Sequence, residues 1–296
     1  MIGLALGGGG ARGAYQIGAW QALTELKVDI TAVAGASIGA LNGALVVQGD
    51  LDRAIQAWTD FDPRRLRRFN PKTIYRLLGD AALILLPWPL GKISAGVRTA
   101  RLLFLLRTGA RAAGTTKAIV DLVKSGFLDD QRLRELITRH VSWEAIVGSG
   151  KKLYVATTTG WPVVLGPRRR RQAIYHDAVQ TRSPAELVDL ITASMSLPFI
   201  YSAVALDDVL HLDGGLKDRI PISPLDHSGV RKIVAVHLKP GRTTDYPACS
   251  QAEIIDVSPS QDLGGFFKGT LNFGRDMKEL IRLGYQDTLA ACQARF

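Results

Sequence analysis

Apolar and glycine-rich stretches alternate at the start of the chain in an order that repeats. A short apolar run at residues 2–6 leads into glycines, and residues 14–26 are good helix formers. A second apolar run at residues 30–34 leads into residues 35–39, and residues 40–47 are again rich in alanine and leucine. Each unit has the pattern of strand, tight turn and helix, so we expect an α/β unit with a parallel strand pair.

The remainder of the chain continues this pattern with wider spacing. Short apolar runs predict strands at residues 152–158, 209–212, 232–238 and 253–257. Longer stretches predict helices at residues 129–140, 185–195 and 275–294. No internal repeat is visible, and no apolar run reaches the roughly 18 residues that a membrane-spanning helix needs.

The composition is that of a globular chain. Its 296 residues and apolar fraction of 47% suffice for a sizeable core. Cys249 and Cys292 are the two cysteines, which excludes a disulfide framework, and no Cys/His cluster has zinc-ligand spacing. Residues 1–6 lack the basic start and cleavage site of a secretory signal. We therefore expect no bound metal and no signal peptide, with a reducing, cytoplasmic location.

The positive charge is concentrated in one segment. The net charge is +10, and residues 63–117 hold twelve basic residues against one acidic residue, Asp80. The segment also has apolar runs at residues 81–90 and 102–106, with Trp88 in the first. Such a cationic apolar helical insert suits peripheral contact with an anionic membrane surface. A helical lid over an acyl pocket fits the same pattern, and the two interpretations are compatible.

Arginine-rich stretches at residues 64–68 and 168–171 raise the question of nucleic-acid binding. Aromatic residues rarely interleave with them, and no recognition motif is present. We therefore expect no nucleic-acid partner. The sequence leaves the oligomeric state open.

The first glycine stretch suits the binding of a negative oxygen. Between a strand and a helix, bare backbone N–H groups can approach such an oxygen, helped by the helix dipole. The stretch fits G-x-G-x-x-G, but a dinucleotide fold would have an acidic residue about 20 residues on, after the second strand. That position holds glycine, alanine and serine, and Asp29 lies before the strand instead. A nucleotide site is therefore disfavoured.

The second turn has the pattern of a nucleophile elbow. Ser37 lies between Gly35 and Gly39, and Gly-x-Ser-x-Gly between strand and helix presents a serine hydroxyl on a strained turn. The alternative is an ordinary helix cap, because serine is a favoured N-cap residue. The preceding glycine loop, at the end of a predicted neighbouring strand, favours the nucleophile.

A serine nucleophile needs a base, and the histidines offer no distinctive candidate. The five histidines lie in stretches typical of strands or surfaces: His140, His176, His211, His227 and His237. A desolvated carboxylate can serve instead. Asp213 closes an apolar strand before Gly214 and Gly215, where the chain must turn sharply. An ordinary turn aspartate is the alternative interpretation.

With these three motifs in order, the chain resembles the patatin-like phospholipases. The resemblance takes in residues 193–199, before the strand that leads to Asp213, and residues 284–287 near the C-terminus. It covers roughly residues 1–60 and 120–292. It implies a three-layer α/β/α fold with a mostly parallel central sheet, as a single domain over residues 1–296 with the insert or lid at about 63–117.

The resemblance also implies a Ser-Asp dyad, with Ser37 as nucleophile, Asp213 as general base and no cofactor. The oxyanion hole would be the loop of Gly8, Gly9, Gly10, Arg12 and Gly13. Gly9 and Gly10 would be the chief donors, and Arg12 would support the loop. The implied activity is hydrolysis of lipid esters through an acyl-enzyme.

Two positions depart from the family pattern. Arg219 precedes Ile220 and Pro221 where the family often has asparagine before proline, and Tyr201 stands where a second proline is common. Both could reshape the mouth of the site.

Two other functions remain open from the sequence. One is a Ser-His-Asp esterase of the α/β-hydrolase type with His227 or His237 as base, although that fold places its elbow later in the chain. The other is a non-catalytic membrane-associated module that binds a lipid without cleaving it.

Overall fold

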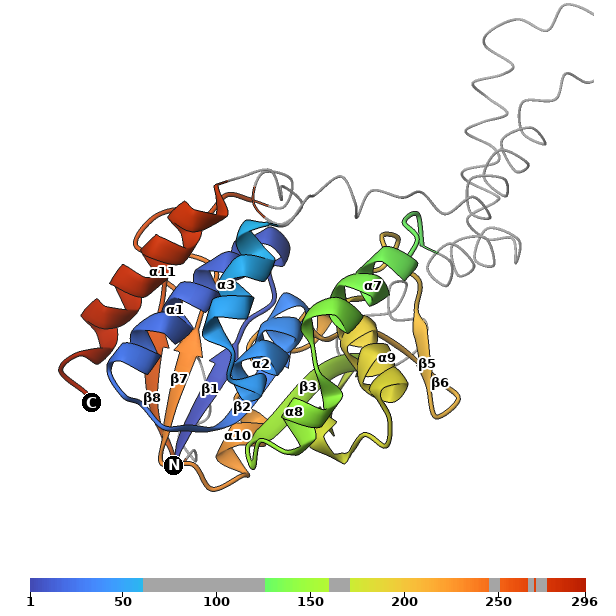
Figure 1. Cartoon of the computed structure of the whole chain (residues 1–296), viewed down its shortest axis with the longest axis horizontal. Coiled ribbons are helices and arrows are strands. Elements are labelled where there is room, and N and C mark those ends of the chain that lie inside the picture. The colour runs from blue at the N-terminus through green and yellow to red at the C-terminus, as the bar shows by residue number, and fades with distance from the viewer. Residues whose placement is uncertain (61–125, 160–170, 245–250, 266–268, 270–275) are drawn as a thin grey trace, which may run out of the picture.

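The structure is a computed structural model that describes residues 1–60, 126–159, 171–244, 251–265, 269 and 276–296 (Figure 1). The described residues form one eight-stranded sheet in the order β5-β6-β3-β2-β1-β7-β8, with β4 also paired to β3. The predicted cationic insert at residues 63–117 lies outside the described residues, as does Cys249.

The parallel half of the sheet contains the strands that the apolar runs predict. It consists of β1 (Ile2–Leu6), β2 (Ile30–Ala36), β3 (Lys152–Thr159), β7 (Lys232–Val236) and β8 (Glu253–Val257). β1 pairs in parallel with both β2 and β7, which confirms the predicted parallel pair. The carboxyl ends of β1 and β2 therefore meet at one edge of the sheet.

The other half is antiparallel. β4 (Gln172–Asp177) and β6 (Val209–Asp213) both pair antiparallel with β3, and β5 (Val204–Leu206) pairs with β6. Sequence patterns predict β6 but miss β4 and β5. β4 is nowhere fully buried and β5 has three residues, so neither carries a clear apolar run.

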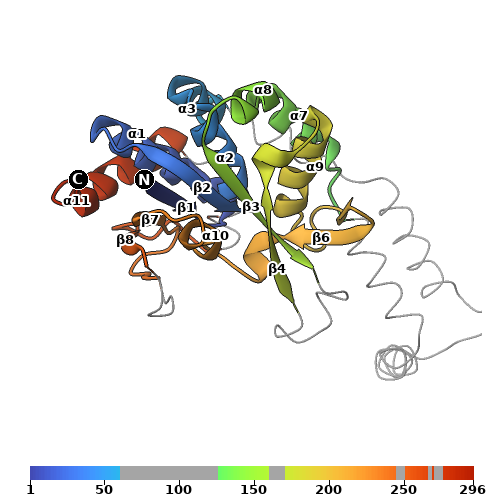
Figure 2. The same cartoon turned by 90° about the horizontal axis from the view of Figure 1, so that it is seen from below.

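Most described helices cover one face of the sheet (Figure 2). They are α1 (Ala14–Glu25), α2 (Ile38–Gln48), α3 (Leu51–Thr59), α7 (Gln131–His140), α8 (Trp143–Val147), α9 (Pro184–Met195) and α11 (Met277–Cys292). The short α10 (Ser223–Asp226) packs on the opposite face, against β1 and β2. The short helices α3, α8 and α10 are absent from the sequence prediction.

The alternation along β1 decides which core each residue joins. Leu4 and Leu6 belong to the larger core beneath α1 and α2, whereas Ala5 belongs to the smaller core with Leu225 of α10. Side chains of a strand point alternately to the two faces, so a strand buried on both faces is continuously apolar. This burial on both faces explains why the N-terminal strands are so clear in the sequence.

Helix α11 clamps α1, which carries the glycine loop at its start. A Cβ on Gly18 would lie 1.8 Å from the carbonyl oxygen of Ile281, and one on Gly284 would lie 1.9 Å from that of Tyr15. The Tyr15 hydroxyl donates a hydrogen bond to Asp287 Oδ2 at 3.0 Å. The backbones of the two helices thus touch, and this contact accounts for the glycine in the C-terminal motif at residues 284–287.

The described helices include none that combines the length and apolarity needed to cross a bilayer.

We expect Gly18→Ala to destabilise the protein by about 3 kcal/mol or more, because the added methyl group must push two backbones apart. Equilibrium unfolding in urea would measure the loss. Gly265→Ala is the matched control, since a Cβ there meets no atom within 4 Å. Equal stability of the two variants would contradict the close helix contact.

Candidate active site

Ser37 occupies a sharp turn between β2 and α2. Its backbone angles are φ 56° and ψ −127°, a conformation that residues other than glycine rarely adopt. α2 begins at the next residue, Ile38, so Ser37 lies at the N-terminus of that helix. The predicted elbow is therefore present as a strained strand-turn-helix connection, and the helix begins two residues earlier than the sequence predicts.

The two glycines of the elbow are required by contact with backbone atoms. A Cβ on Gly35 would lie 2.1 Å from the carbonyl oxygen of Gly39, and one on Gly39 would lie 2.2 Å from that of Leu6. No rotamer change can relieve such overlaps. The strand, the helix and the end of β1 can approach closely only because both positions lack side chains.

A buried hydroxyl from α9 fixes the elbow. Ser194 Oγ accepts a hydrogen bond from the Ser37 backbone N–H at 2.9 Å and donates one to the Ala156 carbonyl oxygen at 2.7 Å. Ser194 is completely buried. The Ser37 N–H is therefore already occupied by a hydrogen bond within the protein. Through Ser194, α9 and β3 together hold the strained residue in place.

Asp213 lies at the end of β6, where the antiparallel half of the sheet begins. It is the register partner of Thr157 on β3, and its N–H donates to the Ser196 carbonyl at 3.0 Å. A Cβ on the next residue, Gly214, would lie 2.2 Å from the Ala156 carbonyl oxygen, so only glycine lets the chain turn here. The first glycine of the Asp-Gly-Gly sequence is therefore a structural requirement of this corner.

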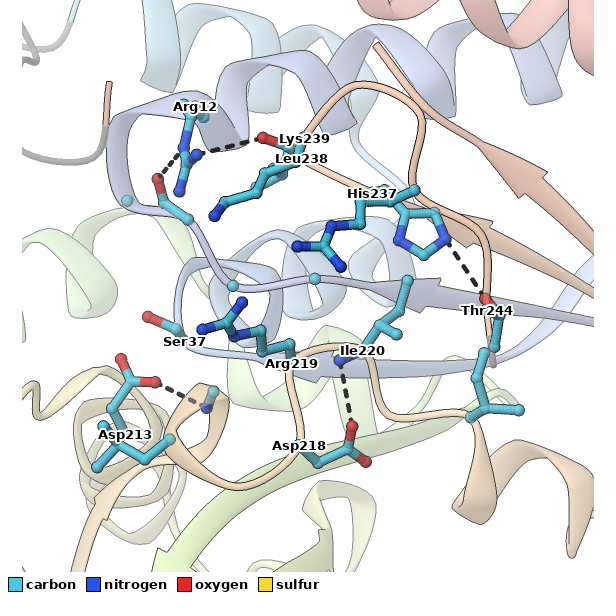
Figure 3. A pocket seen from close by; sticks show the side chains of 18 of the residues that line it. Arg12, Ser37, Asp213, Asp218, Arg219, Ile220, His237, Leu238, Lys239 and Thr244 are labelled. Carbon is cyan, nitrogen blue, oxygen red and sulfur yellow. Dashed lines mark hydrogen bonds between the residues drawn. The ribbon is translucent and has the colours of Figure 1, made fainter. Parts of the chain in front are cut away.

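The Asp213 carboxylate is buried, with one oxygen still to be satisfied. Oδ1 accepts from the Gly215 N–H at 2.8 Å, whereas Oδ2 is buried without a hydrogen-bond partner among the described residues. Burial raises the pKa of Asp213 to about 6, and two groups act in the opposite direction: the Ser37 side chain, which is close to the carboxylate but forms no well-aligned hydrogen bond with Oδ2, and the Gly215 N–H. Figure 3 shows the free oxygen on the side of Ser37. An unsatisfied acceptor of this kind is suited to take up a proton.

The glycine loop divides into bonded and unbonded N–H groups. Gly7 donates to the Val236 carbonyl at 3.3 Å, and Gly8 donates to the Arg219 carbonyl at 3.1 Å. Within the described part of the chain, no acceptor takes the N–H of Gly9 or Gly10. Of the three consecutive glycines in the predicted oxyanion set, Gly8 thus has an occupied N–H, whereas Gly9 and Gly10 keep theirs available.

Gly8 and Gly13 matter because they lack side chains. A Cβ on Gly8 would lie 3.2 Å from that of Ser37, and one on Gly13 would lie 2.7 Å from Ile38 Cγ1. Both glycines allow the loop to pack against the elbow.

The Arg12 side chain supports the glycine loop through hydrogen bonds to main-chain carbonyl oxygens. Its Nε donates to the Gly9 carbonyl at 3.2 Å, and its Nη1 donates to the Leu238 carbonyl at 3.3 Å. Burial lowers the pKa of Arg12, and the nearby charge of Arg219 acts in the same direction, while Asp262 opposes both. The guanidinium thus ties the Gly9 peptide to the end of β7.

These groups line one cavity of about 570 Å³. Ser37, Asp213 and the glycine loop form one side of it, and the segment after β7 forms another (Figure 3). Ser37 is 7% exposed and Asp213 4%, so these two residues lie at the bottom of the cavity. Residues from both ends of the chain and from its middle meet there.

Of the five histidines, His237 is the one that lines this cavity. Its Nε2 lies 2.7 Å from Asp256 Oδ1 and 3.3 Å from Thr244 Oγ1. His227 is exposed on the far side of α10, with its Nδ1 3.4 Å from Ser223 Oγ. Neither ring nitrogen that makes these contacts is directed to Ser37.

Two further histidines are structural. His176 Nε2 and His211 Nδ1 lie 2.9 Å and 2.8 Å from the Thr157 hydroxyl, and burial lowers the pKa of His211 to about 4. Within the described residues, no cluster of His, Cys, Asp and Glu could hold a metal ion.

Sequence reasoning missed Ser194, Asp218 and the wall formed by residues 238–244. Ser194 lies within residues 193–199, a segment that carries part of the family resemblance. A serine on the buried face of an apolar helix is a usable signal, because a buried hydroxyl needs a partner. The wall after β7 has no comparable signal, since it lies in a loop.

Comparisons with known proteins agree with this geometry. The family model described as patatin-like phospholipase matches residues 4–226. A patatin-like phospholipase domain-containing protein of Caenorhabditis elegans is 52% identical over 66 residues, which are 22% of this chain and 6% of that protein. A lysophospholipase of Aspergillus terreus is 57% identical over 44 residues, 15% of this chain and 3% of that one. The chain thus spans only a small part of these relatives.

A solved structure shares the fold. Human GIVD cytosolic phospholipase A2 aligns with a TM-score of 0.53 at 11% identity, over 99% of this chain and 59% of that one. This likeness concerns the fold alone.

We expect Ser194→Ala to lower kcat by about ten- to a hundredfold, because the elbow loses its anchor and small displacements of a reacting group are costly. It should also cost about 1–3 kcal/mol of stability, since the Ser37 N–H is left without a partner. Ester hydrolysis and urea unfolding measure the two effects. Ser196→Ala is the control, because that hydroxyl donates only within its own helix, to Thr192 O at 2.9 Å. Equal activity of the two variants would contradict the anchoring role.

Proposed function

Because this chain belongs to the patatin-like phospholipase family, we propose that it is a serine acyl hydrolase that cleaves carboxylic esters of lipids. Ser37 is the nucleophile, Asp213 is the general base, and the N–H groups of Gly9 and Gly10 form the oxyanion hole. The substrate is a lipid ester, and the chemistry calls for neither a metal nor an organic cofactor.

One observation carries the proposal. Asp213 Oδ2 is buried without a partner on the side of a strained serine, in a cavity that also contains two unbonded N–H groups. A buried unsatisfied acceptor and a strained backbone both cost free energy, and such features concentrate at functional sites. A helix cap or turn aspartate would need neither.

The first half of the reaction forms the acyl-enzyme. Ser37 Oγ attacks the ester carbonyl carbon while its proton moves to Asp213 Oδ2. The carbonyl oxygen becomes an oxyanion and accepts hydrogen bonds from Gly9 and Gly10, and each such donor typically lowers the barrier by about 3–4 kcal/mol. The C–O bond to the alcohol then breaks, and the alcohol leaves with the proton from Asp213.

The second half repeats these steps with water. Asp213 takes a proton from a water molecule, and the resulting hydroxide attacks the acyl carbon of the Ser37 ester. The same N–H groups stabilise the second oxyanion. The bond to Ser37 Oγ breaks, the proton returns to Ser37, and the carboxylic acid leaves.

Two alternatives differ from this proposal. The first is an esterase with histidine as the base, and the second is a lipid-binding module without catalytic activity. In the Ser-His-Asp alternative Asp256 would be the acid, since it already binds His237 Nε2, but no described contact joins the other ring nitrogen, Nδ1, to Ser37. A lipid-binding module that does not cleave its ligand would not explain why Asp213 Oδ2 is buried without a hydrogen-bond partner. Contact of residues 63–117 with a membrane remains a prediction, because that segment is outside the described residues.

We expect Ser37→Ala to abolish hydrolysis of p-nitrophenyl butyrate and labelling by a fluorophosphonate probe. Asp213→Asn should lower kcat by at least about a thousandfold, near the upper range for loss of a general base. Circular dichroism would verify that both variants fold. The control His237→Ala should retain most activity, and a thousandfold loss in that variant would favour the histidine-based mechanism instead.

The pH dependence provides an independent test. Since the pKa of Asp213 is about 6, its carboxylate is protonated below that pH and cannot accept the serine proton. We expect kcat/KM to fall about tenfold for each pH unit below 6 and to be level just above it. Unfolding measured over the same range would separate this loss from acid denaturation. Full activity at pH 4.5 would contradict the role of a raised carboxyl pKa.

A further inference from the structure

The cavity contains more positive charge than the proposed reaction uses. Arg219, Lys239 and Arg242 line it, and all three are exposed at its mouth. They come from two loops, one after the Asp-Gly-Gly corner and one after β7. A mechanism that uses Ser37, Asp213 and two N–H groups leaves these cations without a task.

The acidic residues of the cavity offset these cations only in part. The carboxylates among its described lining residues are Asp213 and Asp218, against the three exposed cations and the buried Arg12. Asp218 keeps its charge but accepts its hydrogen bonds from neutral donors, the Tyr175 hydroxyl at 2.7 Å and the Ile220 N–H at 3.2 Å. Among the described ion pairs, none involves the three cations. The mouth is therefore a concentration of positive charge beside a nucleophile.

The main chain fixes Arg219 next to the reacting groups. Its carbonyl oxygen accepts the Gly8 N–H at 3.1 Å, which joins this residue to the glycine loop. Its side chain points into the cavity on the side of Ser37 (Figure 3). Arg219 is also the position at which the sequence departs from the family pattern, where asparagine is common.

We propose that Arg219, Lys239 and Arg242 form a subsite for the phosphate of an anionic lipid headgroup, so that the enzyme prefers lipid esters with an uncompensated phosphate. The inference rests on the proposed function and adds the substrate class. Arginine binds phosphate through paired hydrogen bonds, and lysine adds a compact charge.

The dimensions and chemistry of the cavity fit such a ligand. In a glycerol phosphate ester, a few bonds separate the carbonyl carbon from the phosphorus, so a cavity of about 570 Å³ can hold both groups. A choline headgroup would place its own cation against three like charges, whereas a phosphate monoester would not. Discrimination between these headgroups is therefore the distinctive consequence.

The test uses three lipids with the same oleoyl chain: monooleoylglycerol, oleoyl lysophosphatidylcholine and oleoyl lysophosphatidic acid. Hydrolysis by the full chain gives kcat/KM for each. Binding to the Ser37→Ala protein gives Kd for each without turnover. We expect the lysophosphatidic acid to be favoured over the other two by about tenfold or more, the factor expected of one charge-assisted contact.

The variants remove the cations in two steps. Arg219→Asn introduces the residue common in the family, and Lys239→Gln with Arg242→Gln removes the other two charges. Each should reduce the preference ratio for the anionic lipid by about tenfold. Arg282→Gln on the exposed side of α11 is the matched control, because it removes one positive charge away from the cavity. It should leave the ratio unchanged.

The outcomes separate the two proposals. If no lipid is hydrolysed but the Kd ratios follow the expected order, the catalytic proposal fails and the subsite stands. If the lipids are hydrolysed or bound without preference, or if Arg282→Gln alters the ratio as much as Arg219→Asn, the subsite is refuted. Inorganic phosphate that competes with p-nitrophenyl butyrate, without any lipid preference, would identify a free-anion site and overturn the headgroup assignment.

Discussion

The contact of backbone with backbone around Ser37 is the constraint on which the site depends. The strained turn exists because Gly35 and Gly39 allow β2, α2 and the end of β1 to approach within distances that any side chain would prevent. Ser194 then fixes the turn through a hydrogen bond from a third element. Strain of this kind persists only where the surrounding structure determines it from several directions. The position of the hydroxyl thus follows from the packing of the whole N-terminal unit.

The remaining parts of the site are joined to this unit by further contacts that involve main-chain atoms. Arg12 connects the Gly9 peptide to the end of β7, and the clamp between α1 and α11 holds the helix that follows the loop. Asp213 arrives from the antiparallel half of the sheet, where β6 pairs with β3. Because β3 lies between β2 and β6, it sets the spacing between Ser37 and Asp213. The site therefore lies at the junction of the two halves of the sheet.

The sequence predicts the parts of this structure that local chemistry determines. Strands buried on both faces, such as β1 and β2, are visible as apolar runs, and glycine spacing indicates the two turns. β4 and β5 are hidden because most of their residues are partly or fully exposed, so their formation depends on pairing with β3 and β6, respectively, and not on their own composition. The tertiary partners of Ser194 and the occupied N–H of Gly8 were not predictable, because both depend on residues that are distant in sequence.

One hydrogen bond, from the Gly8 N–H to the Arg219 carbonyl, has a consequence for how such a site can diversify. The bond joins the glycine loop and the loop after the Asp-Gly-Gly corner through main-chain atoms alone, so it makes no demand on the identity of the residue at position 219. Natural variation can therefore exchange that side chain, and with it the chemistry presented to an incoming molecule, while the alignment of the two loops is inherited intact.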